Sequence, residues 1–471
     1  MTDTTPIADL APTLARLRAA QAARVPDYAQ RIDDLERLRS AFKARLDAMN
    51  AAVSADFGHR SRHETLVSDG MTVLGEIDHL RRHLKRWMKP QRRRVDMLFL
   101  PARAQVRVQP LGVVGVISPW NYPVNLALMP LAVAIAAGNH VYLKPSEHTP
   151  RTSEFLRTLL ADVFPAERVA VALGDGDVAA AFSALPFDHL FFTGSTAVGR
   201  KVLAAAAPNL TPVTLELGGK SPAIVADGYP LDRAAARIAS GKWLNAGQTC
   251  IAPDYVYVPR AQRDAFVAAL AQEVRARYPT LDDNPDYTRI VNRAQFERLR
   301  GYLDDARAHG LTVMPLVAVD DARAAERRVL PPTLVLEPGD DARVMQDEIF
   351  GPILPILSYD ELDAVLAAVN RRDRPLALYH FDHDRERTRR VLDGTVVGGA
   401  AINDTVLQFA QADLPFGGVG PSGMGHYHGR EGFLTFSKQT SVFWQARFTG
   451  MALFKPPYRG LADRLVKFLT R

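Results

Sequence analysis

Only one residue of this chain can act as a thiol nucleophile, because Cys250 is the single cysteine among 471 residues. A lone cysteine forms no internal disulfide, so it is either a small buried apolar residue or a reactive thiol. Its neighbours favour the second interpretation: Gly247 permits a backbone bend, while Gln248 and Thr249 bring polar groups to the sulfur. Pro253 limits any helix that follows. A thiol at a break in regular structure, near free amide donors, is typical of a nucleophile.

A carboxylate suited to base chemistry lies upstream of the cysteine. Glu216 stands between two leucines and just before a Gly-Gly bend. A carboxylate in apolar surroundings has a raised pKa and can accept a proton near neutral pH. The alternative interpretation is a structural carboxylate that pairs with a nearby lysine such as Lys220.

An asparagine amide follows the apolar segment 113–117, which has the composition of a buried strand. Asn121 lies between Pro119 and Pro123 on a stiffened loop. In a doubly wound sheet the carboxyl ends of strands bind ligands, and a neutral amide donor suits a developing oxyanion. The alternative is a structural turn asparagine.

Two further strand ends carry groups suited to a phosphorylated ligand. Lys144 and Glu147 follow strand 141–143 and offer a cation and a carboxylate, although a surface turn is the alternative. Segment 192–199 follows a strand and opens a helix, a context that favours a pyrophosphate near the helix N-terminus. It is not Gly-x-Gly-x-x-Gly, so the Rossmann fingerprint in its usual form is absent.

The elements that must position these groups follow from hydrophobic periodicity. Residues 8–90 have helical spacing, including single helices predicted over 31–49 and 71–87. From residue 104 the period becomes two, which predicts a hairpin that leads into strand 113–117. Strands then alternate with helices to about residue 402, which indicates two α/β layers, and the tail predicts a strand over 436–444.

The motifs resemble, in order, those of the aldehyde dehydrogenase superfamily, from residue 118 to residue 423. The matching segments are 118–123, 144–147, 192–199, 215–222, 245–250, 348–352 and 414–423. The residues around Cys250 and the segment 420–429 resemble the class 3 branch. Within that branch the sequence is similar to bacterial coniferyl aldehyde dehydrogenases, and next to fatty aldehyde dehydrogenases.

This resemblance implies roles for the residues singled out above. Cys250 would be the nucleophile, Glu216 the general base and Asn121 a donor to the oxyanion. A cofactor-binding set would hold NAD or NADP: Trp120, Lys144, Glu147, Thr193, Gly194, Ser195, Gly199, Leu217, Glu348 and Phe350. A lysine tolerates a 2′-phosphate and a glutamate repels one, so the choice between NAD and NADP stays open.

The resemblance also implies architecture and assembly. We expect two doubly wound Rossmann-like α/β domains and a small β element that bridges subunits. The expected boundaries are 1–218 for the cofactor-binding domain (with hairpin 103–114 given to the bridging element), 219–425 for the catalytic domain, and 426–471 for a bridging strand and C-terminal tail. Class 3 relatives are commonly dimers, so a homodimer is expected.

Composition excludes several other classes of protein. The apolar content of 47% and charged content of 23% are those of an ordinary globular chain. The net charge of +6 is weak evidence for a nucleic-acid partner, and none is expected. The longest apolar run, 126–137, is too short for stable membrane insertion.

His426 and His428 lack partners at ligand spacing, so no metal is expected. Without a visible secretory signal, a cytoplasmic location with a reduced thiol is expected.

The expected reaction is oxidation of an aldehyde to a carboxylic acid through a thiohemiacetal and a thioester on Cys250. Four aromatic residues suit a coniferyl-like ring, or are simply core: Tyr122, Trp243, Tyr255 and Phe409. A long-chain aliphatic aldehyde is the alternative, and the amphipathic segment 461–469 could contact a membrane, cover a substrate entrance or pack on protein. Two competing hypotheses are a catalytically silent relative and an enzyme that passes the thioester to coenzyme A or phosphate. Glu216 favours water as the acceptor.

Overall fold

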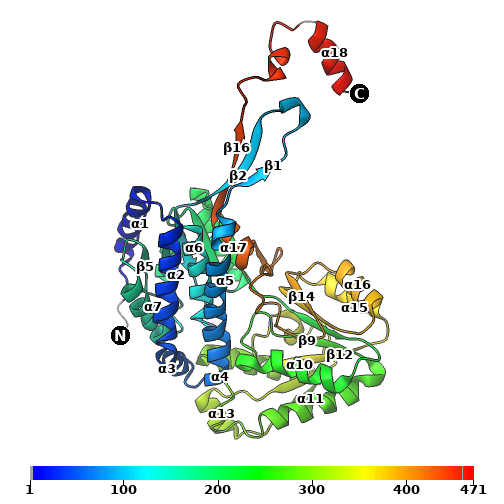
Figure 1. Ribbon diagram of the computed structural model, residues 1–471. Coiled ribbons are helices and arrows are strands. Elements are labelled where there is room, and N and C mark those ends of the chain that lie inside the picture. Colours follow the sequence, from blue (N-terminus) through cyan, green and yellow to red (C-terminus); the bar gives the residue numbers. More distant parts are fainter. Residues whose placement is uncertain (1–3, 459, 471) are drawn as a thin grey trace.

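The computed structural model describes residues 4–458 and 460–470. Two α/β lobes lie side by side, and a narrow arm projects from between them and carries the C-terminal residues (Figure 1). The expected α/β fold is therefore confirmed. Of the described residues, none belongs to a helix both long and apolar enough to cross a bilayer.

The first lobe is built on a six-stranded sheet in the order β15-β7-β6-β3-β4-β5. Its strands are β3 (Val113–Ile117), β4 (His140–Lys144), β5 (Val169–Val171), β6 (His189–Thr193), β7 (Val213–Glu216) and β15 (Gly423–Met424). All pairs are parallel except β15 with β7. The connecting helices are α6 (Asn125–Ala137), α7 (Pro150–Val163), α8 (Gly176–Ser183) and α9 (Thr196–Ala206). Parallel strands covered on both faces are apolar throughout, and β3, β4 and β6 are buried along their whole length.

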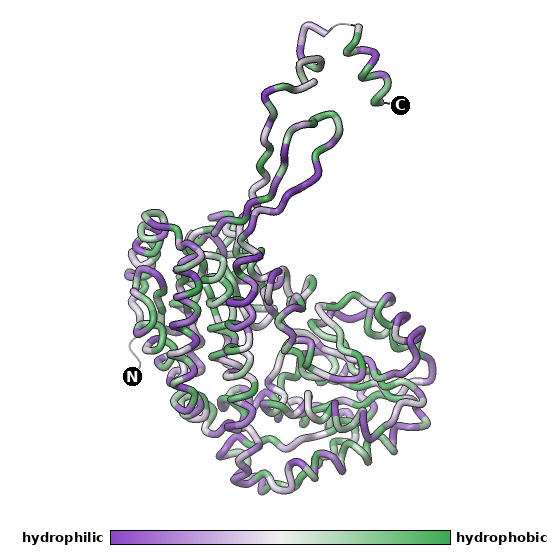
Figure 2. Tube along the Cα trace, viewed as in Figure 1, coloured by the Kyte–Doolittle hydropathy of each residue, from purple (hydrophilic) through white to green (hydrophobic). Residues whose placement is uncertain are grey.

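The N-terminal region is helical, as the spacing predicts (Figure 2). Its helices are α1 (Ile7–Ala23), α2 (Tyr28–Lys43), α3 (Leu46–Phe57), α4 (Arg62–Thr65) and α5 (Thr72–Trp87). Helix α1 packs on β3 and β4, whereas α2, α3 and α5 pack on α6 and α7. A π-helical turn, Leu66–Met71, joins α4 to α5. The single helix expected over 31–49 is instead two helices, because the chain turns at 44–45. Buried apolar residues continue on both sides of that turn, so the spacing does not reveal the break.

The second lobe is built on a seven-stranded sheet in the order β10-β11-β12-β9-β8-β13-β14, with only β10 antiparallel. Its strands are β8 (Pro222–Val225), β9 (Tyr255–Pro259), β10 (Thr312–Pro315), β11 (Thr333–Leu336), β12 (Ile353–Tyr359), β13 (Ala377–Phe381) and β14 (Gly399–Ile402). Its helices are α10 (Leu231–Trp243), α11 (Arg263–Arg277), α12 (Arg293–Ala308), α13 (Asp321–Arg327), α14 (Arg343–Gln346), α15 (Leu362–Arg371) and α16 (Arg385–Gly394).

The arm is a three-stranded antiparallel sheet of β1 (Gln91–Arg93), β2 (Arg103–Pro110) and β16 (Ser437–Trp444). The hairpin predicted over 103–114 does not form, because β2 pairs with β1 and β16 while β3 joins the parallel sheet. Asn139 fixes the corner between β2 and β3, since its Oδ1 accepts from Leu111 N at 2.7 Å and from Gly112 N at 3.0 Å. Gly112 has φ 142°, a conformation that glycine adopts without strain.

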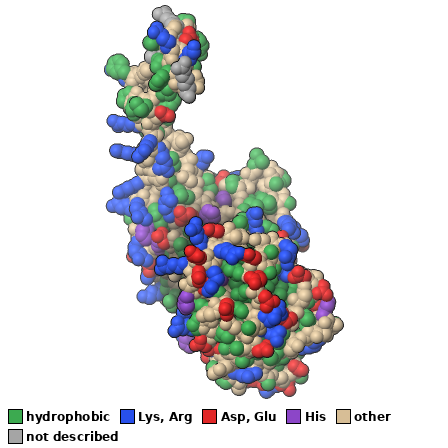
Figure 3. Space-filling model, turned by 90° about the vertical axis from the view of Figure 1, so that its right-hand side faces the viewer, with side chains coloured by type: hydrophobic (Ala, Val, Ile, Leu, Met, Phe, Trp, Pro, Cys, Tyr) green, Lys and Arg blue, Asp and Glu red, His purple; other side chains and the backbone are tan. Residues whose placement is uncertain are grey.

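Two short helices flank the last strand of the arm. Helix α17 (Gly429–Thr435) precedes β16, and α18 (Gly460–Leu469) lies beyond the arm's far end (Figure 1). Lysine and arginine side chains line the arm, and apolar side chains gather towards its tip (Figure 3).

Candidate active site

The segment that carries Cys250 connects α10 to β9 through an irregular turn. Asn245 and Ala246 have φ of 53° and 52°, values that side-chain-bearing residues rarely adopt, and Gly247 has φ 74°. A Cβ on Gly247 would lie 2.2 Å from the carbonyl oxygen of Gly351, so only glycine fits there. Strain of this kind persists where the surroundings hold the chain firmly, and it is concentrated at functional sites.

The thiol of Cys250 is free and partly buried. Burial raises its pKa to about 12, and the nearby carboxylates Glu348 and Glu216 act in the same direction. The backbone N–H groups of Cys250 and Ile251 oppose this shift. Since the pKa is raised, the thiol is protonated at neutral pH in this arrangement, and attack on a substrate requires loss of its proton to a base.

Asn121 lies directly beside the cysteine segment. Its Nδ2 donates to the carbonyl oxygen of Gln248 at 3.1 Å, and Nδ2 of Asn245 donates to Asn121 O at 3.0 Å and to Gln248 O at 3.1 Å. The next residues are also joined, because the hydroxyls of Tyr122 and Thr249 lie 2.6 Å apart. The loop after β3 and the loop before β9 therefore form one buried, hydrogen-bonded unit.

Glu216 is the last residue of β7 and is buried. Within residues 4–458 and 460–470, neither carboxylate oxygen has a hydrogen-bond partner. Burial therefore raises its pKa well above the ordinary value. The alternative pairing with Lys220 is wrong: that ammonium instead contacts Asp254 and donates to Val344 O at 2.7 Å. Asp254 offered no sequence signal for this pairing beyond its place four residues after the cysteine.

Glu348 lies opposite, against the Gly-Gly bend that follows Glu216. A Cβ on Gly218 would lie 2.1 Å from Glu348 Oε2, so the absence of a side chain makes room for the carboxylate. Burial raises the pKa of Glu348 to about 8, and the Gly219 N–H partly opposes this shift. Two residues on, Phe350 has φ 49° and its ring packs edge-on against Trp120, with centroids 5.3 Å apart.

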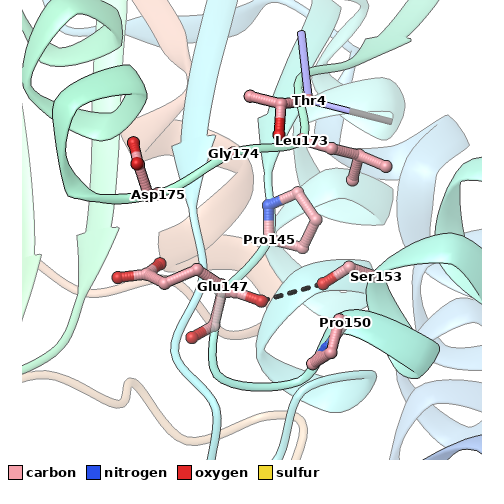
Figure 4. Close-up of a pocket in the computed structure, with 9 residues that line it drawn as sticks. Thr4, Pro145, Glu147, Pro150, Ser153, Leu173, Gly174 and Asp175 are labelled. Atoms are coloured by element: carbon pink, nitrogen blue, oxygen red, sulfur yellow. Dashed lines mark hydrogen bonds between the residues drawn. The ribbon is translucent and has the colours of Figure 1, made fainter. Parts of the chain in front are cut away.

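A pocket of about 180 Å³ lies at the carboxyl ends of β4 and β5 (Figure 4). Its lining includes Pro145, Glu147, Ser153, Gly174 and Asp175. Lys144 Nζ donates to Glu147 Oε2 at 2.9 Å, and Ser153 Oγ donates to Ser146 O at 2.9 Å. Thr4 and Asp175 were missed from the sequence, although Gly174-Asp175 at the end of a strand was an available signal.

The turn from β6 into α9 supplies a second part of the same sheet edge. Ser195 caps α9, and Thr193 Oγ1 is buried without a hydrogen-bond partner among the described residues. A Cβ on Gly199 would lie 2.7 Å from the side chain of Leu217, which brings α9 close against the end of β7. Unpaired amides at a helix N-terminus bind phosphate, so these residues fit a dinucleotide.

Two of the four aromatic residues considered for a substrate wall lie in the hydrophobic core instead. Trp243 is buried and donates through Nε1 to Pro352 O at 3.3 Å, and Tyr255 is buried within β9. Tyr122 lies beside the cysteine segment, and Phe409 packs against Phe416. Across the described residues, no three His, Cys, Asp or Glu side chains gather where they could hold a metal ion.

Comparison with known proteins places this geometry in a family context. The profile described as "Aldehyde dehydrogenase family" matches residues 8–442. The chain is 54% identical over 453 residues to a "Probable coniferyl aldehyde dehydrogenase" of Pseudomonas aeruginosa, covering 96% of this chain and 94% of that protein. The structure "Substrate bound state of Staphylococcus Aureus AldH" aligns with TM-score 0.92 and 36% identity, over 98% of this chain and 99% of that one. An aldehyde dehydrogenase of Mycobacterium tuberculosis "complexed with NAD+" aligns with TM-score 0.85 and 27% identity, over 95% and 92%.

Proposed function

Because the chain belongs to the aldehyde dehydrogenase family, we propose that Cys250, Glu216 and Asn121 carry out its NAD- or NADP-dependent oxidation of an aldehyde to a carboxylic acid. The observation that carries this assignment is their arrangement. The buried amide of Asn121 is hydrogen-bonded to Gln248 in the segment that carries the one thiol of the chain. The buried carboxylate of Glu216, which has no hydrogen-bond partner in the described part of the chain, raises the pKa of that thiol.

In the first step the Cys250 thiol gives up its proton to solvent water, the sulfur forms a bond to the aldehyde carbon, and the C=O π bond breaks with its electron pair moving to oxygen. The carbonyl oxygen then carries a negative charge, which N–H donors stabilise. A carboxamide nitrogen has two N–H groups, so the bond from Asn121 to Gln248 O leaves the second for this oxyanion. The backbone N–H of Cys250 is the other proposed donor.

A bound NAD or NADP would supply the hydride acceptor that this oxidation needs. We propose that Lys144 and Glu147 contact its adenosine ribose and that Glu348 and Phe350 lie near its nicotinamide end. The remaining proposed contacts are Trp120, Thr193, Gly194, Ser195, Gly199 and Leu217. The pocket beside Glu147, the α9 N-terminus and the Trp120–Phe350 ring pair support this assignment.

After hydride loss the substrate is a thioester on Cys250, and Glu216 acts as the base that activates water. Glu216 accepts a proton from water as the oxygen attacks the thioester carbon, the C–S bond breaks, and the carboxylic acid leaves. The raised pKa of Glu216 makes it a stronger base once it is ionised.

We propose an aromatic aldehyde of the coniferyl type as substrate. The similarity to the Pseudomonas aeruginosa protein supports this choice, and Tyr122 and Phe409 remain candidates for the ring contacts. The test is cofactor reduction, followed optically, with coniferaldehyde, benzaldehyde and a long-chain alkanal, each with NAD and with NADP. A clear preference for coniferaldehyde is expected, and a preference for the alkanal would contradict the aromatic assignment.

The long-chain aldehyde remains a second candidate because of α18. This helix exposes apolar side chains, with Leu461 52% and Phe468 77% exposed, while Arg464 and Lys467 add positive charge. Such a surface suits a substrate delivered from an apolar phase.

We further propose a homodimer in which the arm bridges subunits, supported by the open edges of β1 and β16. The proposed division of the chain remains 1–218, 219–425 and 426–471. A cytoplasmic location is proposed because a lone nucleophilic thiol must stay reduced.

A further inference from the structure

A buried ion pair from the N-terminal region contacts the Asn121 loop: Arg60 lies between α3 and α4, and Asp69 lies between α4 and α5. Arg60 Nη2 and Asp69 Oδ2 are 3.1 Å apart, and both side chains are fully buried. Asp69 belongs to the π-helical turn between α4 and α5, a local irregularity that often accompanies a functional requirement. A buried ion pair contributes little net stability compared with apolar residues, so its presence calls for a reason other than stability.

Arg60 contacts the loop directly. Its Nη1 donates to the carbonyl oxygen of Asn121 at 2.8 Å. Its guanidinium also lies between two rings, 4.8 Å from the centroid of Tyr122 and 5.1 Å from that of Phe57. A planar guanidinium that is stacked on rings and hydrogen-bonded at its edge has little freedom, and lysine cannot reproduce this geometry.

Asp69 holds the other end of the same loop. Its Oδ1 accepts from Val124 N at 3.2 Å and from Asn125 N at 2.8 Å, where α6 begins. The two members of one ion pair therefore contact the backbone on both sides of Pro123. The Asn121 carboxamide is attached to a backbone segment that is fixed at its carbonyl and again three residues later.

A neighbouring carboxylate extends the network to the cysteine segment. Glu64 Oε2 accepts from Asn245 N at 3.1 Å and from Thr288 Oγ1 at 2.8 Å. Asn245 Nδ2 in turn shares the Asn121 carbonyl with Arg60. Helix α4 and the π-helical turn thus supply buried polar contacts to both loops of the site.

We propose that Arg60 and Asp69 are positioning residues, which fix the backbone of residues 121–125 so that the Asn121 amide meets the oxyanion formed on Cys250. This rests on the proposed role of Asn121. Neither residue touches substrate in this scheme. Displacement of reacting groups by about 1 Å lowers rates by about 10²-fold, so a loosened loop has a measurable effect on turnover.

The test is a double-mutant cycle of Arg60→Lys with Asn121→Ala, measured as the rate of first-turnover cofactor reduction with coniferaldehyde. Arg60→Lys alone is expected to lower this rate about 10-fold, less than the roughly 10²-fold loss from removal of an oxyanion donor. In the Asn121→Ala background, Arg60→Lys is expected to change the rate less than about 2-fold, because the amide that it positions is gone.

The chain offers a matched control at the amino-terminal ends of the strands of the same sheet, opposite the end that carries the Asn121 loop. Arg168 is also buried, pairs with Asp34 at 2.9 Å, and donates through Nη1 to a carbonyl, Asn139 O, at 2.7 Å. Arg168→Lys is expected to lower the melting temperature by an amount similar to Arg60→Lys while it leaves the first-turnover rate unchanged. If Arg60→Lys does not fold, Arg60→Met with Asp69→Asn removes both buried charges, and the same loss of rate is expected.

The outcomes separate the positioning role of Arg60 from the oxyanion role of Asn121. An equal loss from Arg60→Lys in both backgrounds would overturn the positioning role but leave the role of Asn121 intact. An unchanged rate in folded Arg60→Lys, with only a lower melting temperature, would do the same. A wild-type rate in Asn121→Ala alone would overturn the oxyanion role itself, and the inference with it.

Discussion

The centre around Cys250 and the arm are unfavourable for opposite reasons. The centre buries polar groups away from water, and the arm exposes apolar side chains to water. In the centre, the oxygens of Glu216 and Thr193 are buried without hydrogen-bond partners among the described residues. In the arm, Trp444 is 56% exposed and the nearby Phe448 is 80% exposed. A buried polar group without a hydrogen bond destabilises the folded protein, and so does an apolar patch exposed to water. Neither feature helps the chain to fold. In the proposed function, ligand and substrate relieve the first cost and the partner subunit of the proposed homodimer relieves the second, so the two regions should respond differently to substitution.

The largest expected effect is at the nucleophile. Cys250→Ala should lower aldehyde oxidation by about 10⁴-fold or more, because no other thiol can form the thioester. The melting temperature should change little, since one small, partly buried side chain replaces another. Steady-state cofactor reduction and thermal unfolding measure the two properties. Retained turnover in Cys250→Ala would contradict the mechanism.

A smaller loss is expected at the base. Glu216→Gln should slow deacylation by about 10²-fold or more while thioester formation continues, since in the proposed mechanism the thiol proton passes to solvent water and Glu216 acts only as the base that activates the hydrolytic water. Rapid-mixing experiments should show a burst of about one reduced cofactor per site. Glu76→Gln is the matched control, because Glu76 is also buried and accepts from Gly429 N at 3.2 Å. If turnover is slow and no burst is seen, Glu216 is needed for thioester formation, before deacylation.

The reactivity of the thiol should rise with pH over a wide range. A raised pKa means that the thiolate is a minor fraction at neutral pH and grows as pH increases. Inactivation by iodoacetamide should therefore accelerate about 10-fold per unit from pH 7 to 9. A short peptide with one cysteine, measured in parallel, should level off near the ordinary cysteine pKa. If the inactivation rate of the protein levels off at a lower pH than that of the peptide, the thiol is activated before substrate binds, which would contradict the raised pKa.

The smallest effect on activity is expected in the arm. If the proposed homodimer forms through the arm, Trp444→Arg should shift it towards monomer, because a charge replaces an exposed apolar side chain on the edge strand β16. Turnover per chain should change less than about 2-fold. Gln439→Arg adds the same charge at an exposed polar position on the same strand and should leave the dimer intact. Light scattering after size exclusion distinguishes these results, and a persistent Trp444→Arg dimer would place the interface elsewhere.

The sequence predicted the α/β alternation and the helical N-terminus, because period and composition report local burial. Short motifs with unusual neighbours also singled out Cys250, Glu216 and Asn121 as candidates for the site, and the structure brings Asn121 against the cysteine segment. The pairing of β2 with β16 was not predicted from the residues alone, because alternation does not say which strand a partner is. Arg60 and Asp69 were missed for a related reason: their contacts with residues 121–125 span more than 50 positions, and neither stands in a recognisable motif.

The first sheet is completed late in the chain, because its outer strand β15 follows all the strands of the second lobe. Strand β7 gains its outer neighbour β15 only at Gly423 and Met424, and β2 gains β16 only after that. At about 5 to 20 residues per second, synthesis needs about 10 to 40 s to add the roughly 200 residues that separate β7 from β15. Through that interval β7 is the open outer strand of the nascent first lobe, and an unpaired strand edge is prone to wrong pairing while the second half of the chain is still being made on the ribosome.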